Sequence, residues 1–140
     1  MSETTTATGQ CLCGSVTVTA AVESRFDACH CKMCRTWGGG PYFSIHADTV
    51  TFTGDDLIAS YTSSEWAERA FCRRCGTHLY FRLKHDSGYS LPLGLLNDDH
   101  EARFEEQIFI DRKPAAYSFA DDTENLTAAE TLAKYTPPAS

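Results

Sequence analysis

The chain has 140 residues, 42% of them hydrophobic and 22% charged, which fits one globular domain with its own apolar core. The net charge of −7 argues against nucleic acid as a partner, and no apolar run is long enough to cross a membrane. The first ten residues, "MSETTTATGQ", lack the basic and apolar regions of a secretory signal, so we expect a cytoplasmic location with neither nucleic-acid nor membrane partners.

Most of the predicted elements are short strands. Residues 15–20, "SVTVTA", alternate apolar and polar side chains, the pattern of a half-buried strand. Further runs rich in β-branched or aromatic residues cover 41–46, 49–53, 57–62, 68–71, 79–83, 89–96 and 107–111. Pro92 lies inside one of these runs and predicts an edge strand or a bulge there.

A single helix is predicted near the C-terminus, at Ala128–Tyr135. Thr127 precedes it and Glu130 follows three residues later, the spacing of a capping box. The many short strands predict a mainly β fold of antiparallel sheets, as a sandwich or an open barrel. We expect one domain over 9–135, between a flexible N-terminus at 1–8 and a flexible tail at 136–140.

Seven cysteines in this chain require an explanation, and each of them lies in a tight cluster. A disulfide framework normally needs an even count and an oxidising compartment, and buried structural thiols would be scattered. Metal binding explains the clustering better, and zinc is the metal that four thiolates typically hold. The clusters are "CLCG" (Cys11, Cys13), "CHCKMC" (Cys29, Cys31, Cys34) and "CRRCG" (Cys72, Cys75).

Two of the clusters suit a closed zinc site. "CRRCG" resembles a zinc knuckle, in which Gly76 can adopt the positive φ that a tight turn favours, and "CLCG" ends in Gly14 similarly. In a regular strand, Cys11 and Cys13 would project from the same face. Four thiolates from these two pairs would form a closed structural site that ties distant segments together.

The remaining thiols, Cys29, Cys31 and Cys34, leave one zinc position without a cysteine. Catalytic zinc keeps such a position open for water or substrate, whereas a histidine would close it. The candidates for closing it are His30, His46, His78, His85 and His100. Spacing does not decide between these alternatives, nor does it fix which cysteines share an ion. A redox pair of Cys72 and Cys75 is a further alternative.

The residues after the third cysteine of "CHCKMC" suit an anionic thiol. Backbone N–H groups at Gly38, Gly39 and Gly40 can approach a carboxylate closely, and Arg35 can pair with one. The alternative is that the glycines form a flexible turn. For Trp37, packing in the core is favoured over lining a pocket.

Three motifs in one order resemble the glutathione-dependent formaldehyde-activating enzyme family. They are "GQCLCGSV", "CHCKMCR" and "FCRRCGTHLYFR", followed by "IFIDRKPAAYSFADD", and together they extend from Gly9 to about Asp122. The resemblance implies a β-rich, Mss4-like fold and two zinc ions per chain. It implies Cys11, Cys13, Cys72 and Cys75 as structural ligands, and Cys29, Cys31 and Cys34 as catalytic ones.

The activity that the resemblance implies is a carbon–sulfur lyase reaction, the addition of glutathione to formaldehyde. The partners would be a small thiol and a small aldehyde. Zinc with three thiolates carries net negative charge, so holding the nucleophile is favoured over polarising the aldehyde. The alternative from another class is a zinc-stabilised binding module of the same fold without catalysis.

Two positions depart from the family pattern. Gln107 stands where a histidine is common, just before the "IFI" strand. Tyr117, and no tryptophan, lies near the place where a tryptophan often follows the lysine of "DRKP". If these residues shape substrate choice, formaldehyde and glutathione need not be the substrate pair of this chain.

Overall fold

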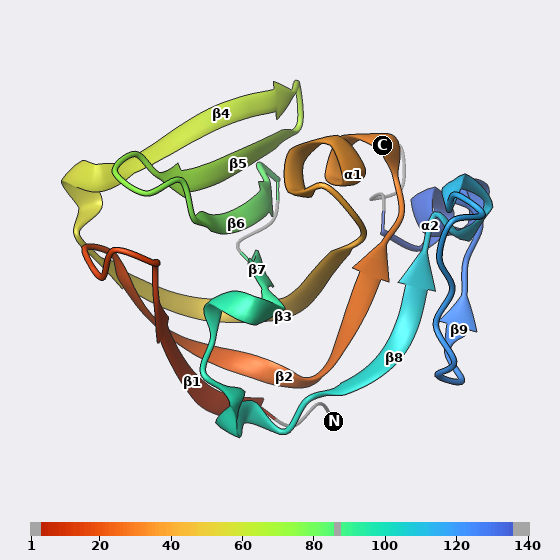
Figure 1. Ribbon diagram of the computed structural model, residues 1–140, viewed down its shortest axis with the longest axis horizontal. Coiled ribbons are helices and arrows are strands. Elements are labelled where there is room, and N and C mark those ends of the chain that lie inside the picture. Colours follow the sequence, from red (N-terminus) through yellow and green to blue (C-terminus); the bar gives the residue numbers. More distant parts are fainter. Residues whose placement is uncertain (1–3, 86–87, 136–140) are drawn as a thin grey trace. The chain divides into compact units, whose positions relative to one another are not determined.

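Strands dominate the computed structural model, which describes residues 4–85 and 88–135 (Figure 1). The strands are β1 (Thr4–Gln10), β2 (Thr17–Cys29), β3 (Tyr42–Thr53), β4 (Ile58–Ser64), β5 (Ala67–Cys72), β6 (His78–Leu83), β7 (Tyr89–Pro92), β8 (Arg103–Ile108) and β9 (Glu124–Asn125). The helices are α1 (Lys32–Gly38) and α2 (Ala128–Tyr135). The predicted mainly β class is confirmed.

Within the domain predicted over 9–135, the chain forms two compact units. The first unit comprises Met1–Ser24 and Ser44–Ala102, and the second comprises Arg25–Phe43 and Arg103–Ser140. Each cysteine group predicted above falls within one unit, the group of four in the first and the group of three in the second.

The first unit is built from antiparallel strands. β1 pairs with the first half of β2, and β4, β5 and β6 form a meander that continues through β7 to β3 (Figure 1). Alternate residues of β2 are buried from Val18 to Val22, as the predicted half-buried strand requires. They pack in a core that also contains Val16, Ile45, Leu79 and Leu91.

Two predicted strand boundaries differ from those observed in this unit. The runs at 41–46 and 49–53 belong to one continuous strand, β3. Pro92 is the last residue of β7, beyond Ser90, the residue that pairs with β6. β7 lies between β6 and β3, so the edge strand or bulge predicted from Pro92 is not found. Pro92 instead stands at the end of the strand, opposite Ser44 of β3, and the chain turns into a 3₁₀ segment after it.

The second unit contains parallel pairings that the sequence did not predict. The last residues of β2 pair in parallel with β8, and β8 pairs in parallel with β9, so the sheet is mixed rather than purely antiparallel. A parallel pairing needs a long connection, and here β2 and β8 lie far apart in the sequence. Half-buried aromatic rings pack together here, with Phe26 stacked on Phe104 at 5.2 Å and Phe119 edge-on to Phe104 at 5.3 Å.

β8 also ends earlier than the predicted run at 107–111. Phe109 adopts a left-handed backbone with φ of 55°, which stops the strand after Ile108. Its N–H donates to the Thr131 hydroxyl of α2 at 3.2 Å.

The C-terminal helix is confirmed at Ala128–Tyr135, and so is its capping box. The Thr127 N–H donates to Glu130 Oε1 at 2.9 Å, and the Glu130 N–H donates to Thr127 Oγ1 at 3.2 Å. The prediction of a single helix was wrong, because α1 is a second one. It is only seven residues long, too short to be stable by propensity alone, so its local sequence carries a weak helix signal.

The two predicted flexible ends are only partly covered by the described residues. From Thr4 onward the N-terminal segment forms β1, in which Thr4 pairs with Glu23 and Gln10 with Thr17. Residues 1–3 and the predicted tail at 136–140 lie outside the described residues. Within the described part of the chain, neither length nor hydropathy qualifies any helix as a membrane span.

A buried carboxylate holds α2 against β8. Glu106 is 1% exposed and accepts hydrogen bonds from Lys134 Nζ at 2.6 Å and Tyr135 Oη at 2.5 Å. Burial, together with the bond to Glu106, raises the pKa of Tyr135 to about 12. The phenol therefore stays protonated as a donor at any ordinary pH.

We expect Glu106→Gln to lower the free energy of unfolding by about 2 kcal/mol, because the buried network loses its negative charge and one of the two oxygens that accept from Lys134 and Tyr135. Lys134 is 40% exposed, which keeps the loss below that of a fully buried ion pair. Urea denaturation measures it. The matched control is Glu105→Gln on the same strand, whose partner Arg103 is 78% exposed. Equal losses from both variants would contradict the role of Glu106.

Candidate metal centres

The sulfur atoms of Cys11, Cys13, Cys72 and Cys75 all lie within 4.8 Å of one another. The Sγ atoms of Cys11 and Cys13 are 3.6 Å apart, and those of Cys13 and Cys72 are 3.9 Å apart. Four sulfurs bonded tetrahedrally to zinc at about 2.3 Å would be about 3.8 Å apart. Both the donor type and the spacing therefore fit a zinc ion.

Two similar turns present these cysteines. In each turn a glycine with φ of 80° donates its N–H to the carbonyl of the first cysteine, Gly14 to Cys11 at 2.9 Å and Gly76 to Cys72 at 2.7 Å. The predicted positive φ is confirmed at both glycines. Cys11 and Cys13 lie in a turn before β2 and not in a strand, so the turn, rather than strand alternation, brings their sulfurs together.

Thr77 joins the two turns and supports a thiolate. Its Oγ1 accepts the N–H of Leu12 at 3.0 Å and lies 3.2 Å from the sulfur of Cys75. Hydrogen bonds from the hydroxyl and backbone of Thr77 lower the pKa of Cys75 to about 5. Sequence reasoning did not identify Thr77, although a hydroxyl two residues after a predicted ligand was the signal available.

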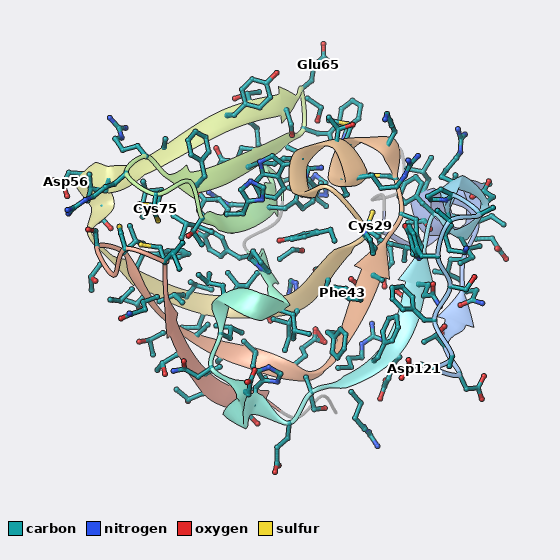
Figure 2. The ribbon with its side chains drawn as sticks, viewed as in Figure 1. Cys29, Phe43, Asp56, Glu65, Cys75 and Asp121 are labelled. Atoms are coloured by element: carbon teal, nitrogen blue, oxygen red, sulfur yellow. The ribbon has the colours of Figure 1, made fainter. Side chains whose placement is uncertain are left out.

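The second group consists of Cys29, Cys31 and Cys34, whose sulfurs lie within 4.8 Å of one another. Cys29 ends β2, and Figure 2 shows it where the strand gives way to α1. Cys31 is the N-cap of α1, and its sulfur accepts the Cys34 N–H at 3.3 Å. Capping of the short helix therefore places two of the three ligands.

The three thiols are crowded together, which makes loss of a proton to form a thiolate anion unfavourable. Hydrogen bonding to the thiols of Cys31 and Cys34, followed by burial, raises the pKa of Cys29 well above its ordinary value. A bound cation would reverse this effect, because its charge favours the thiolate form. A set of three sulfur donors suits a soft metal, and zinc fits it.

Among the described residues, no histidine or carboxylate joins this three-cysteine group as a further potential ligand. His30, the histidine nearest in sequence, is fully buried and uses both ring nitrogens elsewhere. Its Nδ1 lies 2.8 Å from Tyr117 Oη, and its Nε2 lies 2.8 Å from Gln107 Oε1. His30 therefore does not act as a fourth ligand that closes the three-cysteine group in this structure.

The predicted substrate-binding residues lie on or directly after α1. Arg35 Nε donates to the His30 carbonyl at 2.9 Å, which fixes the direction of its guanidinium group. Gly39 is the helix C-cap, with φ of 85°, and its N–H donates to the Arg35 carbonyl at 2.8 Å. A Cβ atom at Gly38, Gly39 or Gly40 would meet nothing within 4 Å, so space is open around all three. The positive φ at the end of α1, rather than close packing, therefore accounts for a glycine at position 39.

The two residues that depart from the family pattern both contact His30. Gln107 and Tyr117, which the sequence marked only as unusual, are the two hydrogen-bond partners of the His30 ring. Burial lowers the pKa of His30, and the positive charges of Lys113 and Arg35 act in the same direction. Sequence reasoning listed His30 as a possible ligand and did not connect it with either partner.

Comparison with known proteins identifies the family. An uncharacterized lyase of Schizosaccharomyces pombe is 32% identical over 127 residues, which cover 89% of this chain and 93% of that protein. A Halomonas elongata protein, provisionally named a glutathione-dependent formaldehyde-activating enzyme, is 31% identical over 83 residues, or 51% of this chain and 53% of that protein.

The crystal structure of a Rhodobacter sphaeroides protein superposes with a TM-score of 0.57 at 20% identity, covering 69% of this chain and 98% of that one, so the two share a fold. Residues 6–112 match the family described as glutathione-dependent formaldehyde-activating enzyme. All seven cysteines lie inside the matched segment, and the chain belongs to the glutathione-dependent formaldehyde-activating enzyme family.

Proposed function

We propose that this protein is a lyase-type enzyme that uses zinc to join a thiol such as glutathione to formaldehyde or a related small electrophile. The observation that carries the proposal is the group of Cys29, Cys31 and Cys34, which holds three sulfur ligands and, among the described residues, no fourth one. Three protein ligands with one position left for substrate is the arrangement of catalytic zinc. Family membership and the lyase name of the S. pombe relative support this proposal.

The side chains of Cys29, Cys31 and Cys34 would hold the catalytic zinc. When bound, zinc supplies the positive charge that stabilises the thiolate form of a substrate thiol near neutral pH. Cys29 and Cys34 are buried, which limits access of water to that side of the group. In the overall addition, a carbon–sulfur bond forms, the carbonyl π bond breaks, and the thiol proton ends on the former aldehyde oxygen.

A second zinc ion, held by Cys11, Cys13, Cys72 and Cys75, would be structural. Four cysteines complete its tetrahedron and leave no position for substrate. We therefore propose two zinc ions per chain. None of the seven cysteines forms a disulfide, and we propose a cytoplasmic location, where thiols stay reduced.

Arg35 and the glycine segment after α1 would bind the carboxylates of the thiol. The bond from Arg35 Nε to the His30 carbonyl holds the planar guanidinium in one direction, which favours pairing with a carboxylate. The N–H of Gly39 already caps α1, and Gly38 is the last residue of the helix, so Gly40 is the better candidate for a backbone donor.

We expect glutathione to bind the zinc-loaded protein at least about tenfold more tightly than S-methylglutathione, because a thioether cannot supply a thiolate. Calorimetry with both ligands at matched pH and salt measures the ratio. In the Cys31→Ser variant, which lacks one ligand of the group, the ratio should fall toward one. Equal affinity for both ligands in the parent protein would favour a binding module without catalysis.

A further inference from the structure

One face of α1 carries two of the three cysteines and then a residue without a side chain. Cys31 caps the helix, Cys34 follows three residues later, and Gly38 is its last residue, four positions further on. Spacings of three and four residues place side chains along one stripe of a helix. Gly38 is therefore the third position of a stripe whose first two positions supply sulfurs to the potential metal group.

Gly38 lies one helical turn from Cys34. Residues four apart on a helix have Cβ atoms about 5–6 Å apart, and each bond from Cα to Cβ tilts toward the helix N-terminus. A side chain at position 38 would therefore extend over the turn that carries Cys34. Cys34 is 5% exposed, whereas Gly38 is exposed, so a surface open to solvent begins one turn from this potential ligand.

The protein itself gives no reason for glycine at position 38. Among the described residues, a Cβ atom there would meet nothing within 4 Å. Positive φ occurs at Gly39 but not at Gly38, so another residue could adopt the Gly38 backbone without strain. Glycine also favours a helix less than alanine does. What the missing side chain leaves is space, next to a proposed zinc ligand, that a bound molecule can occupy.

The large side chains on either side of this space have partners elsewhere. Arg35 Nε donates to the carbonyl of His30, which precedes the helix, at 2.9 Å. The ring of Trp37 packs edge-on against Tyr42, which follows the glycine segment, with ring centroids 5.9 Å apart. These contacts hold both side chains in place, and the space over Gly38 stays open although bulky residues precede it.

We propose that Gly38 is a specificity-determining residue, because the body of a peptide thiol such as glutathione lies over it when the thiol sulfur reaches the three-cysteine group. The inference rests on the function proposed above. A cysteinyl thiol carries its peptide groups just beyond the CH₂ group that bears the sulfur, and these groups need room beside Cys34. The stripe leads on toward Gly40, the candidate donor to a carboxylate. A two-carbon thiol such as 2-mercaptoethanol needs little of this room.

The test compares glutathione with 2-mercaptoethanol in variants of position 38. Cobalt replaces zinc in the purified protein, because the absorption of bound cobalt changes when a further thiolate joins the metal. We expect Gly38→Leu to weaken glutathione binding at least about tenfold and 2-mercaptoethanol binding less than about threefold. The reason is that the leucine side chain fills the space of the peptide and not that of the sulfur.

Gly38→Ala provides a second, milder measurement. It should weaken glutathione binding about twofold to fourfold and leave 2-mercaptoethanol binding unchanged. Its melting temperature should equal or exceed that of the parent, because no contact is lost and alanine favours the helix. A residue with a purely structural role would not combine retained stability with weaker binding of one thiol.

Thr36→Leu is the matched control, since it introduces leucine on the same helix but two residues from both Cys34 and Gly38, away from their stripe. It should leave both affinities unchanged. Mass spectrometry of the bound cobalt separates loss of thiol binding from loss of metal, and Gly38→Ala decides if Gly38→Leu loses the metal.

If the parent binds both thiols and the changes at position 38 weaken neither, or weaken both by the same factor, the role of Gly38 is overturned and the proposed function stands. An equal loss of glutathione binding in Thr36→Leu would overturn that role as well. If neither thiol changes the absorption of the parent protein, the proposed function falls, and the role of Gly38 falls with it.

Discussion

Cys75→Ser is expected to prevent cooperative folding of the protein. Cys75 shares one potential metal site with Cys11, Cys13 and Cys72, and these ligands come from turns far apart in the chain. Zinc bound by four such ligands contributes about 10–16 kcal/mol in zinc-finger peptides, whereas a whole domain is stable by about 5–15 kcal/mol. Loss of one thiolate therefore removes an amount comparable to the entire stability.

Circular dichroism during heating, with zinc quantified by mass spectrometry, measures this effect. The expected outcome is an aggregated or unfolded protein with less zinc. Leu12→Ala is the matched control, because Leu12 lies in the same pair of turns but is 88% exposed and supplies no ligand. The four-cysteine assignment does not survive if Cys75→Ser is soluble and melts at the parent temperature.

Cys31→Ser should have the opposite balance, with the fold retained and the proposed catalytic centre lost. The three ligands of that group lie within six residues of the chain, so their metal connects little of the structure. Cys31 is also the N-cap of α1, and serine is a favoured N-cap residue that can accept the same Cys34 N–H. The helix is therefore kept while a thiolate is removed.

We expect the purified Cys31→Ser protein to contain one zinc equivalent fewer than the parent and to bind glutathione at least about a hundredfold more weakly. Metal analysis and calorimetry measure the two effects. Lys32→Ser, one residue further and exposed, is the matched control and should leave both quantities unchanged. Unfolding of Cys31→Ser as complete as that of Cys75→Ser would mean that the division into a structural and a catalytic site is wrong.

The local features of this protein were predictable from its sequence. The three-cysteine group, the two cysteine pairs that make up the group of four, the positive φ at Gly14 and Gly76 and the capping box at Thr127 each depend on residues within a few positions of one another. Alternation of apolar side chains likewise located the first half of β2. In each case the pattern works because the interacting groups are neighbours along the chain, so spacing alone brings them together.

Tertiary structure decided the features that depend on distant residues. The parallel pairing of β2 with β8 joins segments that no local pattern connects, and α1 forms although its own seven residues are too few to be stable alone. The hydrogen bond from the Leu12 N–H to Thr77 likewise joins two cysteine-bearing turns that lie far apart in the sequence.

The surroundings of the three-cysteine group show the same division. Ligand type and spacing, both local, gave the identity of Cys29, Cys31 and Cys34 as a potential metal group. Whether a histidine joins them depended on what His30 contacts, and its partners Gln107 and Tyr117 are 77 and 87 residues away. A sequence lists the hydrogen-bonding groups that a buried imidazole can choose from, but only the packed fold brings two of them within 2.8 Å and so decides its role.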